Sequence, residues 1–289
     1  MNVKIATAQY DISFLADWSG YRQKIERWVA EACAQDANIL LFPEYFSMEL
    51  ASLFTQEIYS SLSNQLVAMQ SLHDDFMMLF KTLAQQHHCI IQAGTFPVLV
   101  EADVYYNRAY LFMADGTVDY QDKLMMTRFE NEHWLIKGGK ELKCFDTEYG
   151  RIAINICYDS EFPLLARKQV EAGCLIILVP SCTDTVAGFN RVKIGCQARA
   201  LENQCYVVQA SLVGNASWSE AVDVNVGAAA IYTPVDRGFP DNGILSVGIF
   251  NEVQWVIAEI SLSACATVRE QGQVFNYRDW PLQVDLVSS

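Results

Sequence analysis

Strand-length apolar segments alternate with helix-length segments along most of the chain, and this order constrains the fold more than any other feature. Alternation of this kind predicts a layered α/β fold, and hairpin-like neighbouring strands add antiparallel pairing. The sequence therefore predicts a mixed sheet, or two packed sheets, flanked by helices. The predicted strands span residues 3–10, 38–42, 89–95, 105–113, 117–122, 151–157, 174–180, 205–213, 227–232, 244–250 and 253–260. The predicted helices span residues 19–35, 62–88, 162–172 and 189–203.

The 289 residues are predicted to form one domain, because they contain no Gly/Ser/Pro-rich linker, internal repeat or low-complexity segment. Residues 268–289 carry Phe275, Tyr277 and Trp280 without a clear period. We expect them to form a C-terminal tail that packs on the body or on a partner subunit. Residues 1–10 match a strand rather than a signal peptide, and no apolar run approaches membrane-spanning length.

Composition narrows the classes of partner. The chain has 34 Asp and Glu residues against 20 Lys and Arg, a net charge of −14, which argues against nucleic acids and anionic membranes as partners. The odd number of nine cysteines, without a signal-peptide pattern, predicts reduced thiols and a cytoplasmic location. Because no Cys-x-x-Cys pair occurs and only four histidines are present, we expect no metal site.

One thiol, one carboxylate and one ammonium group each follow a predicted strand. Cys157 ends an apolar strand, and the segment Tyr158-Asp-Ser-Glu-Phe-Pro163 after it predicts a helix start. Backbone N–H groups and the positive end of a helix at such a corner favour a lowered thiol pKa. Glu44 follows the strand at 38–42, and Lys123 follows the strand at 117–122. A base, a cation and a thiol at strand ends indicate covalent acyl chemistry.

Each of these residues also has a purely structural interpretation. A cysteine in an apolar strand is most often a small core residue. Glu44 could cap the segment Tyr45-Phe46-Ser47, since carboxylates are favourable at helix starts. Lys123 could be an ordinary surface lysine beyond a hairpin. Spacing along the sequence does not show that the three residues meet.

Four ordered motifs favour the catalytic interpretation. They are Phe42-Pro-Glu44, Asp122-Lys123, Cys157-Tyr-Asp159, and Ala198-Arg-Ala-Leu-Glu-Asn203 with Tyr206-Val. With them, residues 3–270 resemble the nitrilase, or carbon–nitrogen hydrolase, superfamily. The resemblance implies a four-layer αββα sandwich with two packed mixed sheets and a catalytic Glu-Lys-Cys set at Glu44, Lys123 and Cys157. It also implies a homodimer or larger homo-oligomer, and neither a metal nor an organic cofactor.

The resemblance implies a second catalytic glutamate between the lysine and the cysteine. Counting back from Gly139 leads to Glu132, which we expect to orient Lys123 or the substrate amide; Glu130, two positions earlier, is the competing residue. The expected chemistry is attack of Cys157 on the carbonyl carbon of a small amide or N-carbamoyl compound, with a thioester intermediate. Glu44 would be the base and Lys123 the oxyanion donor.

The predicted substrate contacts are less specific. The backbone N–H of Tyr158 is a candidate second oxyanion donor. Asp184 and Arg191 follow a central strand and are candidates for the pocket wall. Glu161 would oppose an anionic substrate and attract an amine, or else cap the helix start. Nitrile hydrolysis, acyl transfer on the same site, and a catalytically silent binding or scaffold protein are alternatives that these motifs leave open.

Overall fold

The computed structural model describes residues 1–134 and 136–287 and has a mixed α/β fold built on a curled sheet. Its described strands are hydrogen-bonded in the order β4-β5-β3-β2-β1-β11-β10-β9-β8, and further strands branch from this path. The strands of the path are β4 (Phe96–Glu101), β5 (Val104–Phe112), β3 (Ile90–Gln92), β2 (Ile39–Leu41), β1 (Asn2–Asp11), β11 (Tyr206–Asn215), β10 (Ile176–Ser181), β9 (Gly150–Ile154) and β8 (Phe145–Thr147). The branches are β6 (Val118–Asp122), β7 (Ile136–Lys137), β12 (Val224–Asn225), β13 (Ala230–Tyr232), β14 (Ile244–Val247) and β15 (Gln254–Ser261).

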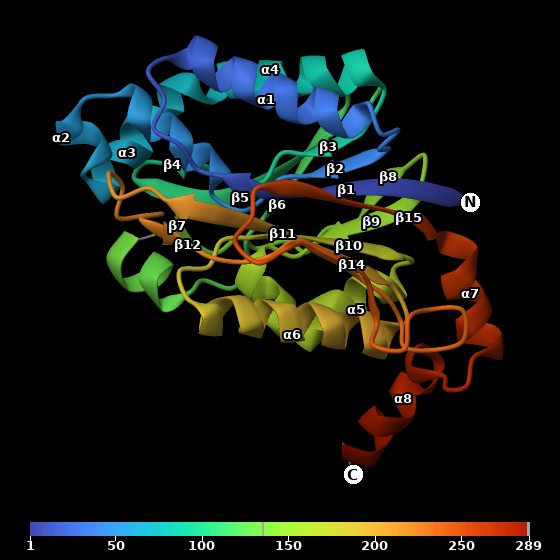
Figure 1. The fold of residues 1–289 in the computed structure, drawn as a ribbon. Helices are drawn as coiled ribbons and strands as arrows, with labels where there is room; N and C mark the ends of the chain where they lie inside the picture. Colours follow the sequence, from blue (N-terminus) through green and yellow to red (C-terminus); the bar gives the residue numbers. More distant parts are fainter. Residues whose placement is uncertain (135, 288–289) are drawn as a thin grey trace.

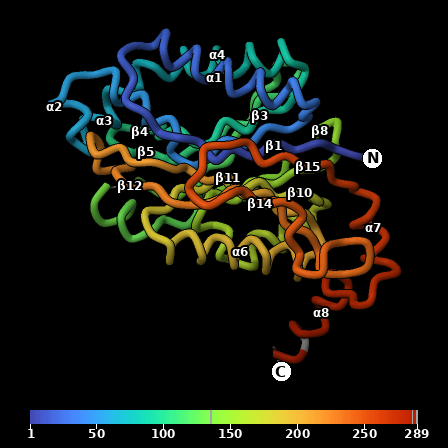
Figure 2. The backbone as a smooth tube through the Cα atoms, viewed as in Figure 1, coloured from blue at the N-terminus to red at the C-terminus, as the bar shows by residue number. Residues whose placement is uncertain are grey.

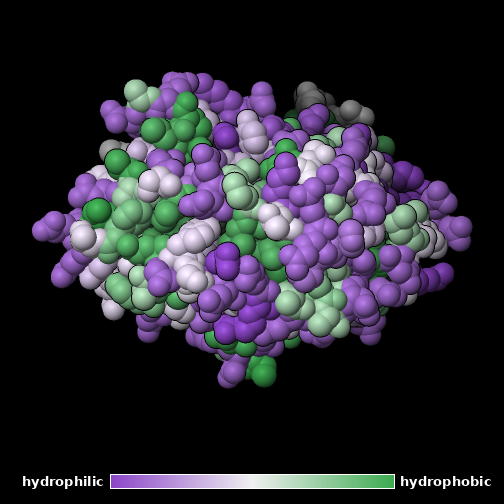
Figure 3. Space-filling model, turned by 90° about the horizontal axis from the view of Figure 1, so that it is seen from above, coloured by the Kyte–Doolittle hydropathy of each residue, from purple (hydrophilic) through white to green (hydrophobic). Residues whose placement is uncertain are grey.

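Helices cover both sides of the sheet. In Figure 1, α1 (Trp18–Cys33) and α4 (His73–His87) lie on one side, and α5 (Pro163–Glu171) and α6 (Val186–Asn203) lie on the other. Seen from the side of α1 and α4, the surface is largely hydrophilic with hydrophobic side chains interspersed (Figure 3). The remaining helical segments are η1 (Phe46–Leu53), α2 (Gln56–Tyr59), α3 (Leu62–Met69), η2 (Gln70–Leu72), η3 (Glu130–Trp134), η4 (Cys157–Glu161), α7 (Leu262–Gln271) and α8 (Asn276–Val287).

Strand β1 joins the two halves of the fold. It pairs in parallel with β2 and β11 and antiparallel with β15. Its side chains alternate between two hydrophobic cores: Ala6 and Tyr10 pack on the side of α1 and α4, whereas Val3 and Ile5 pack on the side of α5 and α6. A strand buried on both faces has little room for polar residues, which explains the continuous apolar runs of the sequence.

The predicted α/β class, with parallel and antiparallel pairing, is confirmed. Two predicted segments are divided differently. The helix expected at 62–88 is α3, η2 and α4 in succession, and the strand expected at 89–95 is β3, after which β4 begins at Phe96. Within the described residues no helix is long and apolar enough to cross a bilayer.

The C-terminal tail is helical, where the sequence showed no period. Helix α7 buries Cys265 and Val268 against the body, and α8 runs on toward the C-terminus beyond it (Figure 2). Arg167 of α5 lies over the rings of Tyr277 and Trp280, and it donates a hydrogen bond to the carbonyl oxygen of Tyr277. The start of the tail therefore contacts its own body, and residues 288–289 lie outside the described part.

The turn after β2 depends on a glycine. Gly94, just beyond β3, has φ +52°, and a Cβ there would lie 2.1 Å from the carbonyl oxygen of Pro43 and 2.4 Å from the ring of Phe46. Only glycine allows this close approach. The residue held by the approach is Glu44, directly after Pro43.

We expect Gly94→Ala to lower the free energy of unfolding by about 2–4 kcal/mol, because the new Cβ meets backbone and cannot be accommodated by a rotamer change. Thermal melting measures this effect. Gly20→Ala in α1 is the control, since its Cβ would have an ordinary 3.6 Å contact with Asp17. A Gly94→Ala protein as stable as the control would contradict the argument.

Candidate active site

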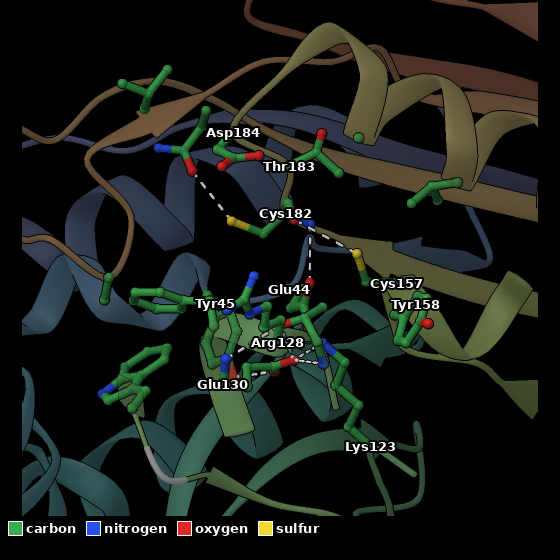
Figure 4. A pocket seen from close by; sticks show the side chains of 18 of the residues that line it. Glu44, Tyr45, Lys123, Arg128, Glu130, Cys157, Tyr158, Cys182, Thr183 and Asp184 are labelled. Carbon is green, nitrogen blue, oxygen red and sulfur yellow. Dashed lines mark hydrogen bonds and ion pairs between the residues drawn. The ribbon is translucent and has the colours of Figure 1, made fainter. Parts of the chain in front are cut away.

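A cavity of about 490 Å³ opens where several strands end. Glu44 follows β2, Lys123 follows β6, Cys157 follows β9 and Cys182 follows β10, and all four line this cavity. Figure 4 shows their side chains converging from different strands. The three residues that the sequence placed at strand ends are therefore brought together.

Lys123 lies between two buried carboxylates. Its Nζ donates to Oε1 of Glu44 at 2.7 Å and to Oε2 of Glu130 at 2.6 Å (Figure 4). All three side chains are at least 97% buried. Asn107 adds a hydrogen bond from Nδ2 to Oε1 of Glu44 at 2.9 Å. A charge in this position must be paired, because burying it alone would be very costly.

The pKa directions assign the charges within this network. Burial opposes ionisation of Glu130, but the charge and hydrogen bond of Lys123 outweigh it and lower the pKa of Glu130. The two carboxylates likewise outweigh the burial of Lys123 and raise its pKa well above the ordinary value. Burial dominates at Glu44 and raises its pKa despite the attraction of Lys123. Lys123 and Glu130 thus form the ion pair, and Glu44 is the carboxylate better able to take up a proton.

Cys157 sits in a strained corner between β9 and η4. Its φ of +48° is in the left-handed region, which a non-glycine residue adopts only when its surroundings hold it there. Ser160 helps to hold it, donating from Oγ to the Cys157 carbonyl oxygen at 2.6 Å. The thiol lies 3.6 Å from the carbonyl oxygen of Cys182, whose backbone N–H donates to Glu44 Oε2 at 3.1 Å.

Burial and the negative charge of Glu44 raise the pKa of Cys157 well above its ordinary value. The expectation of a lowered thiol pKa is therefore wrong for this structure. The backbone N–H groups of the corner are outweighed by desolvation and by the nearby carboxylate. These two effects favour the protonated thiol over the thiolate at Cys157.

Asp159 joins the lysine segment to the cysteine corner. Its carboxyl group accepts from the backbone N–H groups of Leu124 and Met125, at 3.1 and 2.7 Å, and from that of Ile156 at 3.2 Å. These donors flank Lys123 on one side and Cys157 on the other. Because Asp159 is buried, loss of its carboxyl group would leave several N–H groups without an acceptor.

Comparison with known proteins identifies the family of this chain. Residues 4–270 match the sequence model of the carbon-nitrogen hydrolase family. The chain belongs to this family. It is 35% identical over 277 residues to "Probable hydrolase YhcX" of Bacillus subtilis, and the match covers 96% of this chain but 53% of that protein. The chain thus spans about half the length of that relative.

Two further comparisons concern omega-amidases and the fold. The chain is 28% identical to "Omega-amidase NIT3" of Saccharomyces cerevisiae over 200 residues, 66% of each protein. Its fold matches the crystal structure of Saccharomyces cerevisiae Nit3, a member of branch 10 of the nitrilase superfamily. That match has a TM-score of 0.75 and 22% identity and covers 93% of both chains.

The second glutamate in contact with Lys123 is Glu130. Glu132, which we expected beside Lys123, pairs instead with Arg128 at 2.7 Å, and its side chain is 48% exposed. The two residues lie in η3, a π-helical turn in which positions two apart face different sides. Counting back along the sequence from Gly139 therefore selected the wrong member of the pair.

The four expected substrate contacts all line the cavity. They are Tyr158, Glu161, Asp184 and Arg191. The N–H of Tyr158 belongs to the first turn of η4, where backbone N–H groups have no partner inside the helix. Glu161 and Arg191 form an ion pair in the cavity wall, with Nε of Arg191 3.8 Å from Oε1 of Glu161.

Several wall residues were not anticipated from the sequence. Cys182 places a second thiol in the cavity, held at 3.2 Å from Oδ1 of Asn225. Tyr45 and Trp134 pack with ring centroids 4.8 Å apart and form an aromatic wall. No spacing rule predicts these residues, because they come from segments far apart in the chain. Within the described residues no three His, Cys, Asp or Glu side chains are grouped to hold a metal ion.

We expect Glu130→Gln to lower the rate of amide hydrolysis by roughly 10²-fold or more, because it removes one of the two charges that fix Lys123. Glu132→Gln is the matched control. It breaks only an exposed pair worth about 0–1 kcal/mol, so the rate should change less than about threefold. Ammonia release from simple amides, with a melting curve for each variant, measures both. Equal losses in the two variants would overturn the assignment.

Proposed function

We propose that this chain hydrolyses a C–N bond of a small linear amide or N-carbamoyl compound, with Glu44, Lys123 and Cys157 as catalytic residues. The observation that carries the proposal is the buried contact of Lys123 with Glu44, in a cavity that also exposes the Cys157 sulfur. A base, a fixed cation and a nucleophile within one cavity are the elements that acyl transfer to a thiol requires. The yeast relative named an omega-amidase supports amides as the substrate class.

In the acylation step, the Cys157 sulfur attacks the carbonyl carbon while its proton passes to Glu44. The raised pKa values of both groups favour such a coupled transfer over a free thiolate at rest. The negative charge that forms on the carbonyl oxygen is stabilised by Lys123 Nζ and by the N–H of Tyr158. When the C–N bond breaks, Glu44 gives its proton to the leaving nitrogen, ammonia or an amine departs, and a thioester remains on Cys157.

In the second step, water replaces the departed amine. Glu44, again a carboxylate, removes a proton from water as the water oxygen attacks the thioester carbonyl carbon. The same donors stabilise the second oxyanion. The C–S bond then breaks, the sulfur recovers a proton from Glu44, and the carboxylic acid leaves. Atoms and charges balance over the cycle without any further reactant.

Glu130 and Asp159 act through other residues in this proposal. Glu130 keeps Lys123 protonated and fixed between two carboxylates, so that the ammonium group need not reorganise during the reaction. Asp159 keeps the segment after Lys123 and the corner before Cys157 at a constant separation. Both are positioning residues.

Two broader features belong to the same proposal. We propose that the two halves of the curled sheet correspond to the paired sheets of a four-layer αββα sandwich, which the helices on both sides support.

We also propose a homodimer or larger homo-oligomer. Its support is the group of exposed apolar side chains on α5 and α6: Leu164 is 67%, Val186 56% and Ile194 64% exposed.

We expect Cys157→Ala to abolish hydrolysis, by on the order of 10⁴-fold or more, and to abolish any acyl adduct, while leaving the melting curve nearly unchanged. Mass spectrometry of protein quenched in acid during turnover detects the adduct. Cys182→Ala is the matched control: it should still be acylated on Cys157, because Glu44 and Cys157 contact the backbone of Cys182 and not its thiol. Turnover by Cys157→Ala would refute the covalent mechanism.

We expect light scattering at micromolar concentration to give a mass of at least twice 32.5 kDa. Replacing Ile194 by Lys should shift the mass toward that of one chain, because a charge cannot be buried in an apolar contact without a partner. Val67→Lys, at a position that is 64% exposed on α3, is the control. A wild-type particle of one chain would disprove the oligomer.

A further inference from the structure

The basic residues around the cavity are paired with acidic residues, whereas some of the acidic residues there have no basic partner among the described residues. The described part of the cavity wall contains three basic residues, and each has an acidic partner. Lys123 contacts Glu44 and Glu130. Arg128 pairs with Glu132 at 2.7 Å, and Arg191 pairs with Glu161 at 3.8 Å. Among the described residues that line the cavity, no basic side chain is therefore left unpaired to receive an anionic substrate.

Three acidic residues of the same wall have no such partner. Asp184, Glu220 and Asp223 line the cavity and are exposed at its rim, and none makes an ion pair within the described residues. Figure 4 shows Asp184 on the same loop as Cys182. Asp184 is thus two residues along the chain from Cys182, whose backbone contacts Glu44 and Cys157. The rim thus adds unpaired negative charge to an interior in which each basic side chain of the described wall already has an acidic partner.

The segment that carries Glu220 and Asp223 is fixed rather than loose. Ser219 and Val222, their neighbours, are buried, and Ser219 Oγ donates to Oε1 of Gln65 at 2.8 Å. Two hydrogen bonds join the loop of Asp184 to the same region. Thr183 Oγ1 donates to the Val226 carbonyl oxygen at 2.7 Å, and the Val226 N–H donates to the Thr183 carbonyl oxygen at 2.8 Å. The acidic side chains therefore have a preformed arrangement.

Aromatic rings add a second feature suited to a cation. The polar ends of Tyr45 and Trp134 point to other partners: Tyr45 Oη donates to Glu130 at 2.6 Å, and Trp134 Nε1 donates to the Leu62 carbonyl oxygen at 3.2 Å. What these two residues and Phe129 offer to the cavity is ring surface. Aromatic faces attract ammonium and guanidinium groups.

We propose that the substrate carries a positive charge, as an ammonium or guanidinium group, at the end away from the scissile amide. This proposal rests on the proposed function, since it takes the amide to lie at Cys157. The cationic end lies between the aromatic wall and the acidic rim of Asp184, Glu220 and Asp223. If the substrate instead carried a carboxylate at this end, the carboxylate would lie near three negative charges and would find no unpaired basic side chain among the described wall residues.

The test compares three amides of equal length. 5-Aminopentanamide is cationic, hexanamide is neutral and 5-carbamoylpentanoate is anionic. We expect kcat/KM from ammonia release to fall in that order, with at least about a tenfold difference between the first and the last at low ionic strength. The ratio should shrink as salt is added, because exposed charges are screened.

The rim variant is the triple substitution Asp184→Asn, Glu220→Gln and Asp223→Asn, which keeps size and hydrogen-bonding capacity. It should bring the cation-to-anion ratio to within about threefold. The control is Asp75→Asn, Asp241→Asn and Glu270→Gln, which removes the same charge from exposed positions outside the cavity wall. The control should keep the wild-type ratio. An anionic preference in wild type, or a ratio that the rim variant leaves unchanged, would overturn the proposal.

Binding to Cys157→Ala separates this proposal from the proposed function. Calorimetry should show tighter binding of 5-aminopentanamide than of 5-carbamoylpentanoate. Such a preference without ammonia release by the wild type would support the cationic site and refute the hydrolase mechanism. Hydrolysis of all three amides with no preference in rate or binding would refute the cationic site alone.

Discussion

The rest of the site depends on one lysine buried between two glutamates. An ammonium ion in a dry interior is stable only when opposite charges compensate it, and here Glu44 and Glu130 do so at 2.7 and 2.6 Å. The two carboxylates and one ammonium leave a net negative charge beside the Cys157 sulfur. A thiolate would add a second negative charge, in keeping with the burial and the Glu44 charge that raise the pKa of Cys157. In the mechanism that we propose, proton transfer from sulfur is therefore coupled to attack on the carbonyl carbon.

The fold provides this compensation by bringing strand ends together. Glu44, Lys123 and Cys157 each follow a different strand, and the contacts that fix them are between backbone and side chain rather than between the reactive groups alone. Gly94 lets the Pro43 turn approach closely, and Asp159 ties the two flanking segments. Such supports matter because a catalytic side chain displaced by about 1 Å loses much of its effect.

The sequence predicted the part of this arrangement that follows from strand ends. Continuous apolar runs identify strands buried on both faces, and the polar residue after each run is then a candidate for the site. The same reasoning could not choose between Glu130 and Glu132, because the π-helical turn that carries them has no repeating period. A local signal did exist. Thr127-Arg-Phe-Glu130 is a capping box: Glu130 N–H donates to Thr127 Oγ1 at 3.3 Å, and Thr127 N–H donates to Glu130 Oε2 at 2.9 Å.

Residues that no local pattern predicts belong to the cavity walls. Trp134, Cys182 and Asn225 line the same cavity because segments far apart in the chain come together at the strand ends. The helical tail was not predicted because its helices are short and α8 contains Pro281. This division has a functional consequence. Glu44, Lys123 and Cys157 directly follow strands of the sheet, and Glu44 and Glu130 compensate the charge of Lys123, whereas the unpaired acids lie on the loops after β10 and β11. Loop residues can therefore change the substrate's preferred charge without disturbing the compensation that keeps Lys123 ionised.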